Sequence, residues 1–168
     1  MDFEFDDLLQ NAQHTKLAKL ILDSKQLLQD TLNGNESKAA NAIMRVRDTN
    51  YAPTFYNNER ALRSVIKFAY IICIDHYLKV EEMPTGHGIA DVVFIPKRDT
   101  SLPAMIVELK WNKTAKSAIK QIKENHYPEL LRDYVGEMIL VGISYDENSK
   151  EHSCKIEKKA KTPAEDSF

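Results

Sequence analysis

The sequence predicts an α/β protein in which one β-sheet is covered by helices on both faces. Three observations lead to this fold class. The first half of the chain carries apolar residues at helical spacing, and the second half alternates short apolar runs with turn residues. One amphipathic segment between the apolar runs has the period of a helix. The expected order is a set of helices followed by β-β-β-α-β-β.

The composition is typical of one soluble globular domain, with 43% hydrophobic and 29% charged residues in a chain of 168. The net charge of -2 gives no overall reason to expect nucleic acid, so any such argument must be local. The two cysteines, Cys73 and Cys154, make neither a disulfide framework nor a zinc site, which indicates a reducing, cytoplasmic setting. The N-terminus lacks a signal-peptide core, and no run approaches the ~20 apolar residues of a membrane span.

The first half of the chain is expected to form three helices. Apolar residues recur with a helical period over 15–32, and Asn33-Gly34 is a stop signal at the end of that helix. A short helix is expected over 36–47, and a long one over 56–78 after a break in the pattern. The middle of the long helix is apolar on nearly every side, which predicts a central, buried position.

The second half of the chain is expected to form five strands and one helix. The helix is predicted over 114–126, with a short helical turn over 128–134. The segment after the last strand is charged and is expected to be frayed. The predicted strands cover residues 79–83, 89–96, 103–111, 137–145 and 151–158.

Two of these strands carry carboxylates at matching positions. A six-residue loop separates strands 89–96 and 103–111, which favours an antiparallel hairpin. A symmetric register places Val93 opposite Ile106 and Asp91 opposite Glu108. Because like charges directly opposite each other are destabilising, this pair of carboxylates requires a cation. A divalent metal such as Mg²⁺ suits the position, since hard cations take carboxylate oxygens as ligands.

Lys110 lies two residues after Glu108 and therefore points to the same face of the strand. Its ammonium group could polarise a water at the metal or stabilise negative charge on a phosphate. A simpler interpretation is that Asp91 caps a turn and that Glu108 and Lys110 form an ordinary salt bridge at the rim of the sheet. The same Glu-x-Lys spacing occurs at 36–38 and 157–159, where a solvated surface explains it.

Several segments, taken in order, resemble the PD-(D/E)XK nuclease superfamily. The resemblance is closest to the nuclease-like C-terminal domain of bacterial proteins that carry an AAA-type ATPase domain. It implies a restriction-endonuclease-like core (α-β-β-β-α-β, a mixed sheet flanked by helices) over 51–158, with a helical lead-in over 1–50 and a charged flexible tail over 159–168. The segments that carry the resemblance are NNERALRSVIKFAYI, GIADVVFIP, AMIVELKW, AIKQIKENHYPE and ILVGISYD.

The resemblance implies a metal-dependent phosphodiesterase. In such an enzyme, Asp91 and Glu108 would bind Mg²⁺ or Mn²⁺ with the help of the Leu109 carbonyl, and Lys110 would orient the attacking water. Glu59, in the first turns of the long helix, matches the family's helix glutamate and would complete the acidic cluster.

Two further matches and two departures belong to the same resemblance. Gln121 matches the glutamine of the helix that follows, and Tyr127 matches its aromatic partner. The residue before Asp91 is Ala90 in place of proline, which the family tolerates. No Walker-type phosphate loop occurs in the sequence, so the ATPase half is absent and an AAA-type ATPase domain is a candidate partner.

A basic stripe on the predicted helix indicates nucleic acid as the partner. DNA is the expected substrate, although the sequence leaves RNA open, and sequence-independent, salt-sensitive phosphate contacts are expected. His87, between two glycines, could approach a ligand. The alternatives are a solvated helix face, a solvated loop histidine, and a catalytically weak nuclease fold that binds nucleic acid or a partner protein for an ATPase. The edge strand near Cys154 could pair with a second copy. The stripe consists of Lys113, Lys116, Lys120 and Lys123.

Overall fold

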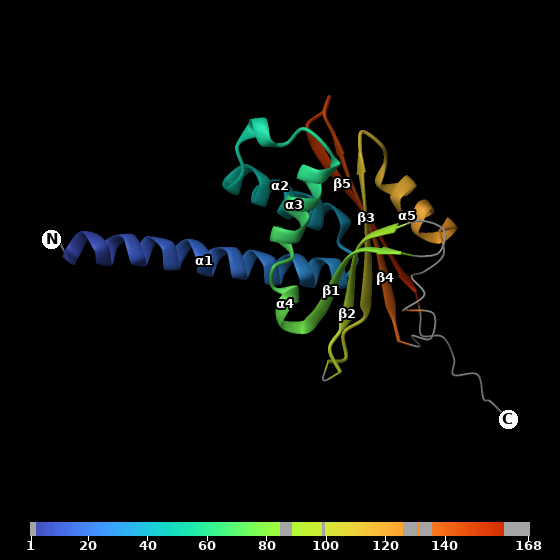
Figure 1. Cartoon of the computed structure of the whole chain (residues 1–168), viewed down its shortest axis with the longest axis horizontal. Helices are drawn as coiled ribbons and strands as arrows, with labels where there is room; N and C mark the ends of the chain where they lie inside the picture. The colour runs from blue at the N-terminus through green and yellow to red at the C-terminus, as the bar shows by residue number, and fades with distance from the viewer. Residues whose placement is uncertain (1–2, 85–88, 99, 126–130, 132–135, 160–168) are drawn as a thin grey trace.

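The computed structural model describes residues 3–84, 89–98, 100–125, 131 and 136–159, which form a five-stranded sheet between two layers of helices (Figure 1). The order of the strands in the sheet follows their order in the chain. Neighbouring strands are antiparallel except for β3 and β4, which are parallel. The strands are β1 (Tyr77–Pro84), β2 (Ile89–Pro96), β3 (Ala104–Trp111), β4 (Met138–Asp146) and β5 (Glu151–Lys159).

The helices lie on both faces of the sheet, which confirms the predicted α/β class and its mixed sheet flanked by helices. The helices before the sheet cover one face, and α5 (Ala115–Glu124) covers the other as it crosses from β3 to β4 (Figure 1). Parallel neighbours require such a crossover. The first group consists of α1 (Phe3–Leu32), α2 (Glu36–Asn50), the short 3₁₀ helix η1 (Pro53–Phe55), α3 (Glu59–Ala69) and α4 (Cys73–His76).

The predicted continuous helix over 56–78 is wrong, because a turn at 70–72 interrupts it. The first helix in this region, α3, ends at Ala69, the four-residue α4 follows the turn, and β1 begins at Tyr77. The apolar run 65–74 continues through the turn into α4, where Ile74 is exposed, so periodicity did not show where α3 ends. The Tyr77 hydroxyl donates a hydrogen bond to the Pro103 carbonyl at 2.9 Å, which ties the start of β1 to the loop before β3.

The other elements lie close to their predicted positions, with two extensions. The first helix, α1, starts at Phe3 instead of residue 15, and α2 continues to Asn50 instead of ending at residue 47. Strands β2 to β5 and α5 agree with the prediction to within two residues. Residues 85–88 between the first two predicted strands, most of the predicted turn over 128–134 and the tail from residue 160 lie outside the described residues.

The core has two apolar layers, one on each face of the sheet. Val93 and Ile106 face α5 and pack with Ile122, whereas Val92 and Val107 belong to the layer beneath the N-terminal helices. This alternation follows the pleat of the strands. Polar residues that continue the α5 side of β3 therefore lie at the end of this apolar layer, next to α5.

The crossover helix α5 packs very closely on β4. A Cβ atom at Gly142 would lie 2.4 Å from the Ala115 carbonyl oxygen and 3.1 Å from the Ala118 Cβ. Thr114 caps the helix by accepting a hydrogen bond from the Ser117 N–H at 3.0 Å. The absent side chain at Gly142 and the cap together fix α5 against the sheet, and α5 carries one of the residues of the site described below.

Among the described residues, no helix combines the length and apolar character needed to cross a bilayer.

Candidate active site

Asp91 lies in β2 where the pairing of β2 with β3 ends. The two strands have the predicted register, with Val93 opposite Ile106. The described pairing ends at Val92, the residue next to Asp91. Asp91 is only 6% exposed, and its Oδ2 accepts a hydrogen bond from the Leu109 backbone N–H at 2.9 Å. The carboxylate thus satisfies a backbone N–H of β3 in place of a carbonyl of β2, which fixes its position.

Arg63 of α3 supplies a cation for Asp91. Its Nη2 lies 2.6 Å from Asp91 Oδ1, and its Nη1 lies 2.7 Å from Glu82 Oε1. Glu82 is the residue of β1 that would face Asp91, but pairing is formed only on either side of this position. Because a buried carboxylate is costly without a partner, Arg63 stabilises Asp91 in the folded chain.

Gln121 of α5 connects Glu108 and Lys110 of β3. Its Nε2 donates a hydrogen bond to Glu108 Oε1 at 2.5 Å, and its Oε1 accepts one from Lys110 Nζ. Glu108 is 4% exposed, and Lys110 is half-buried. The Gln121 amide therefore links Glu108 to Lys110. The simpler interpretation from the sequence was a direct salt bridge between these two residues.

The surroundings of Glu108 disfavour its negative charge. The pKa of Glu108 is raised to about 8, first by burial and then by the nearby Asp91 charge, while Lys110 acts in the opposite direction. Glu59, the first residue of α3, also raises the pKa of Glu108, so its charge is felt at the same place. A cation close to these carboxylates would favour their ionised forms.

The donor set fits a hard divalent cation. Asp91 and Glu108 offer carboxylate oxygens, which Mg²⁺ and Mn²⁺ prefer over nitrogen or sulfur. Among the described residues, no group of three or more His, Cys, Asp or Glu side chains has the arrangement of a metal site. The fit is therefore to an ion held by two carboxylates that keeps several waters, as Mg²⁺ commonly does. Ligation by Glu59 and by the Leu109 carbonyl stays a prediction.

Three lysines of the basic stripe lie on the exposed side of α5, whereas Lys113 precedes the helix, and half of the stripe is neutralised. Lys120 forms an ion pair with Glu124 at 3.5 Å, and Lys123 forms one with Glu157 at 2.5 Å. The other two lysines of the stripe, Lys113 and Lys116, are exposed. These two are the stronger candidates for contacts with phosphate. Tyr127 and His87 lie outside the described residues, so their predicted roles stay predictions.

Two site residues, Arg63 and Glu82, were missed by the sequence analysis, although each has a signal in the sequence. Arg63 follows Glu59 by four residues on a helix, so both are expected on one face. Glu82 and Asp91 lie at equal distances from the centre of the turn between the first two predicted strands. Extending the hairpin reasoning to this first turn would have placed Glu82 beside Asp91.

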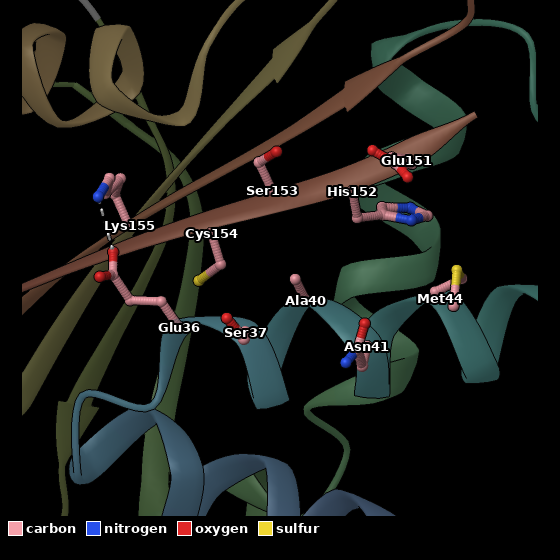
Figure 2. Close-up of a pocket in the computed structure, with 10 residues that line it drawn as sticks. All are labelled: Glu36, Ser37, Ala40, Asn41, Met44, Glu151, His152, Ser153, Cys154 and Lys155. Atoms are coloured by element: carbon pink, nitrogen blue, oxygen red, sulfur yellow. Dashed lines mark ion pairs between the residues drawn. The ribbon is translucent and has the colours of Figure 1, made fainter. Parts of the chain in front are cut away.

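A separate groove of about 450 Å³ lies between α2 and β5 and shares no residue with the acidic cluster (Figure 2). Figure 2 shows Glu36 reaching from α2 to Lys155, where its Oε2 lies 3.6 Å from Nζ. The same oxygen accepts a hydrogen bond from the Ile156 N–H at 3.2 Å. Glu36 thus covers part of the edge of β5, as charged groups commonly do at sheet edges.

His152, which borders this groove, is buried with Tyr56. The Tyr56 hydroxyl lies 2.5 Å from His152 Nε2, and His152 Nδ1 is buried without a hydrogen-bond partner in the described structure. The pKa of His152 is lowered to about 4, mainly by burial and to a smaller extent by the nearby Arg47 charge. Trp111 packs on the same cluster, 5.3 Å from Tyr56, which agrees with an aromatic residue that closes a core strand.

Comparison with family models places most of the chain in one known superfamily. A model of the PD-(D/E)XK nuclease superfamily matches residues 58–155, which is more than half of the chain. The matched range begins next to Glu59 and contains Asp91, Glu108, Lys110 and Gln121. A comparison with curated proteins finds no match.

Proposed function

Because the chain belongs to the PD-(D/E)XK nuclease superfamily, we propose that it is a metal-dependent nuclease that hydrolyses nucleic acid with water as the nucleophile. Membership of this family indicates a phosphodiesterase of the nuclease type. The observation that carries the proposal is the convergence of three side chains that the reaction needs. Glu108 and Lys110 share the Gln121 amide, and Asp91 is anchored to the backbone of the residue between them.

The carboxylates are assigned to the binding of the cation. Asp91 and Glu108, with the Leu109 carbonyl, would hold Mg²⁺ or Mn²⁺, and Glu59 would add negative charge from the start of α3. When bound, the ion supplies Lewis-acid activation of the phosphate and of a water. Both carboxylates are buried, and their attraction for a cation is stronger there than it would be in bulk water.

Lys110 is assigned to the water or to the charge on the phosphate. Its ammonium would orient the attacking water or stabilise the negative charge that develops on a phosphoryl oxygen. The contact with Gln121 holds the ammonium beside Glu108 and keeps it from extending into solvent. A donor that is already in position needs no rearrangement when the charge develops.

The proposal is tested by cleavage assays with the purified chain. Plasmid, single-stranded and branched DNA, and RNA, are incubated with Mg²⁺ or Mn²⁺, and EDTA provides the metal-free control. We expect Glu108→Gln to lower the cleavage rate on the order of a hundredfold or more. Glu151→Gln, which alters an exposed carboxylate on β5, should leave the rate unchanged. Metal-dependent cleavage that persists in Glu108→Gln would contradict the proposed site.

A second candidate function is a nuclease-fold module that binds nucleic acid, or a partner protein for an ATPase, with little or no cleavage. It is favoured by the hydrogen bonds that the site carboxylates already make to protein groups. Both oxygens of Asp91 already have protein partners, and Glu108 accepts from Gln121. An AAA-type ATPase domain and a second copy of the chain are the protein partners proposed for this role.

The second candidate predicts binding without cutting. Lys113→Glu together with Lys116→Glu should weaken binding to labelled DNA and reduce its salt dependence by about two phosphate contacts. The same change at Lys120 and Lys123 should have a smaller effect, because these lysines already have carboxylate partners. Fluorescence anisotropy at several salt concentrations measures both effects. Tight binding with no cleavage of any substrate would favour the module over the enzyme.

A further inference from the structure

We propose that Arg63 is a positioning residue that competes with the divalent cation for Asp91, and that Glu82 retains the guanidinium when the cation binds. This inference rests on the proposed metal site. Arg63 joins the two carboxylates in a bridge, with 2.6 Å from Nη2 to Asp91 Oδ1 and 2.7 Å from Nη1 to Glu82 Oε1. One guanidinium therefore has two carboxylate partners and can release one while keeping the other.

The two partners of Arg63 differ in their need for a cation. The Asp91 side chain is 9% exposed, whereas that of Glu82 is 64% exposed. A carboxylate in solvent tolerates the loss or gain of a partner at little cost, but a buried one does not. Asp91 consequently needs either Arg63 or another cation at Oδ1, since Oδ2 already accepts the Leu109 N–H.

The hydrogen bonding of Arg63 is incomplete. Its Nε is buried and has no hydrogen-bond partner in the described structure. A buried donor without a partner carries a desolvation cost. The guanidinium is thus held at this position by Asp91 and Glu82 and not by a full set of partners. Loss of the contact with Asp91 removes one of only two anchors.

The backbone at Glu82 is shaped for this contact. Glu82 has a φ of 52°, which non-glycine residues rarely adopt, and such a conformation persists only where its surroundings hold it. The pairing of β1 with β2 is formed at Glu81–Val92 and Met83–Ala90 but not at the position between them. The strain therefore coincides with the place where Glu82 meets Arg63, and it directs the Glu82 side chain to the guanidinium.

The count of charges supports competition over simple support. Asp91 and Glu82 bring two negative charges to Arg63, and Arg63 brings one positive charge. A divalent cation placed at Asp91 and Glu108 would lie close to the guanidinium, and the two would repel each other. Transfer of Arg63 to Glu82 alone increases the separation of the like charges and leaves each carboxylate with a partner.

The test is the affinity of the full chain for Mn²⁺ alone, measured by isothermal titration calorimetry and independent of any cleavage. We expect Arg63→Gln to bind Mn²⁺ about tenfold more tightly than the wild type, because one repelling charge is removed and the amide can still donate to Asp91. Its melting temperature in EDTA should be lower than that of the wild type, and Mn²⁺ should raise it by a larger amount. Glu82→Gln should bind Mn²⁺ more weakly, because Arg63 then has only Asp91.

A matched control separates competition from a general effect of charge. Lys67 lies one turn further along α3 and pairs with Glu81 at 2.9 Å, so Lys67→Gln removes a positive charge from the same helix outside the cluster. Its affinity for Mn²⁺ should equal that of the wild type. An equal gain in Lys67→Gln, or no gain in Arg63→Gln, would overturn the competition and leave the proposed nuclease site standing. Absence of saturable Mn²⁺ binding in the wild type and in Arg63→Gln would overturn both proposals.

Discussion

Glu108 is a carboxyl group whose ionisation the fold opposes. Its pKa is raised to about 8, first by burial and then by the neighbouring charge of Asp91. The folded state therefore holds a proton that the unfolded chain releases near pH 4.5, the ordinary value for this carboxyl. Between these two pH values the folded state binds more protons than the unfolded state, so stability falls as the pH rises.

Replacing Glu108 by Gln should remove this dependence on pH. Without divalent metal, we expect Glu108→Gln to be more stable than the wild type at pH 8, with an advantage of about 1.4 kcal/mol for each pKa unit that separates the folded and unfolded states. The advantage should be small near pH 5. Urea unfolding in EDTA at pH 5, 6.5 and 8 measures it. A constant difference between the two proteins at all three values would contradict the assignment of the shift to Glu108.

His152 has the opposite linkage. Its pKa is lowered to about 4 from 6.5, because burial disfavours the charged imidazolium. The unfolded chain therefore binds the proton first, and stability is lost as the pH falls from about 6.5 towards 4. We expect His152→Gln to flatten this part of the stability profile relative to the wild type. Thermal unfolding between pH 7 and pH 4.5 tests this, and parallel profiles for the two proteins would refute it.

At the scale of elements, the strands that carry the site were predictable because their chemistry is local. The pattern of β2 and β3 fixed the register, and Val93 faces Ile106 as predicted. Gln121 was identified by resemblance, but helical periodicity does not predict how it and the lysines share α5. The structure answers this, since Gln121 points to Glu108 while Lys120 and Lys123 pair with Glu124 and Glu157 at the surface.

The end of α3 was not predictable from local pattern. Residues 65–74 are apolar enough to be buried as a helix or as a strand, and their fate depends on contacts made elsewhere in the chain. Tyr70, at the C-terminal end of α3, is fully buried and its hydroxyl lies 2.7 Å from the Thr31 hydroxyl of α1. Tertiary contacts of this kind determine where a helix ends within an apolar run. The spacing of apolar residues in the sequence does not reveal such contacts.

The close approach of α5 to β4 gives a prediction for Gly142. A methyl group at this position would meet the Ala115 carbonyl at 2.4 Å, so α5 must move away from the sheet. We expect Gly142→Ala to destabilise the fold by about 1–3 kcal/mol and to lower cleavage, because α5 carries Gln121. Urea unfolding and the cleavage assay measure the two effects. Ser144→Ala, a change on the same strand that adds no atoms, is the control.

At the scale of the whole molecule, the N-terminal helices are part of the core. Ala39, Ile43 and Val46 of α2 are buried in the same apolar layer as Val141 and Ile143 of β4. The first part of α1 is different, since residues 14–19 are exposed and α1 extends away from the rest of the molecule (Figure 1). The segments before and after the proposed boundary near residue 50 therefore differ in sequence character but share one hydrophobic core.

Two truncations distinguish these roles. Removal of residues 2–19 should leave the melting temperature close to that of the full chain, because the described residues 14–19 bury little apolar surface. Removal of residues 1–50 should prevent folding, since it exposes the apolar layer that α2 covers. Circular dichroism and analytical gel filtration follow both. A folded, soluble product from the longer truncation would show that the domain over 51–158 is independent of its lead-in.

The contact between α2 and β5 also determines when the protein can finish folding during its synthesis. The hydrogen bond from the Ile156 N–H to Glu36 joins residues 120 positions apart, whereas the site residues of β2, β3 and α5 lie in one short stretch of chain. Local units close faster than distant ones. On the ribosome, α2 therefore emerges about 120 residues before the strand that covers its apolar face. We expect the nascent chain to depend on chaperones for that face until β5 emerges, with these site residues assembled first.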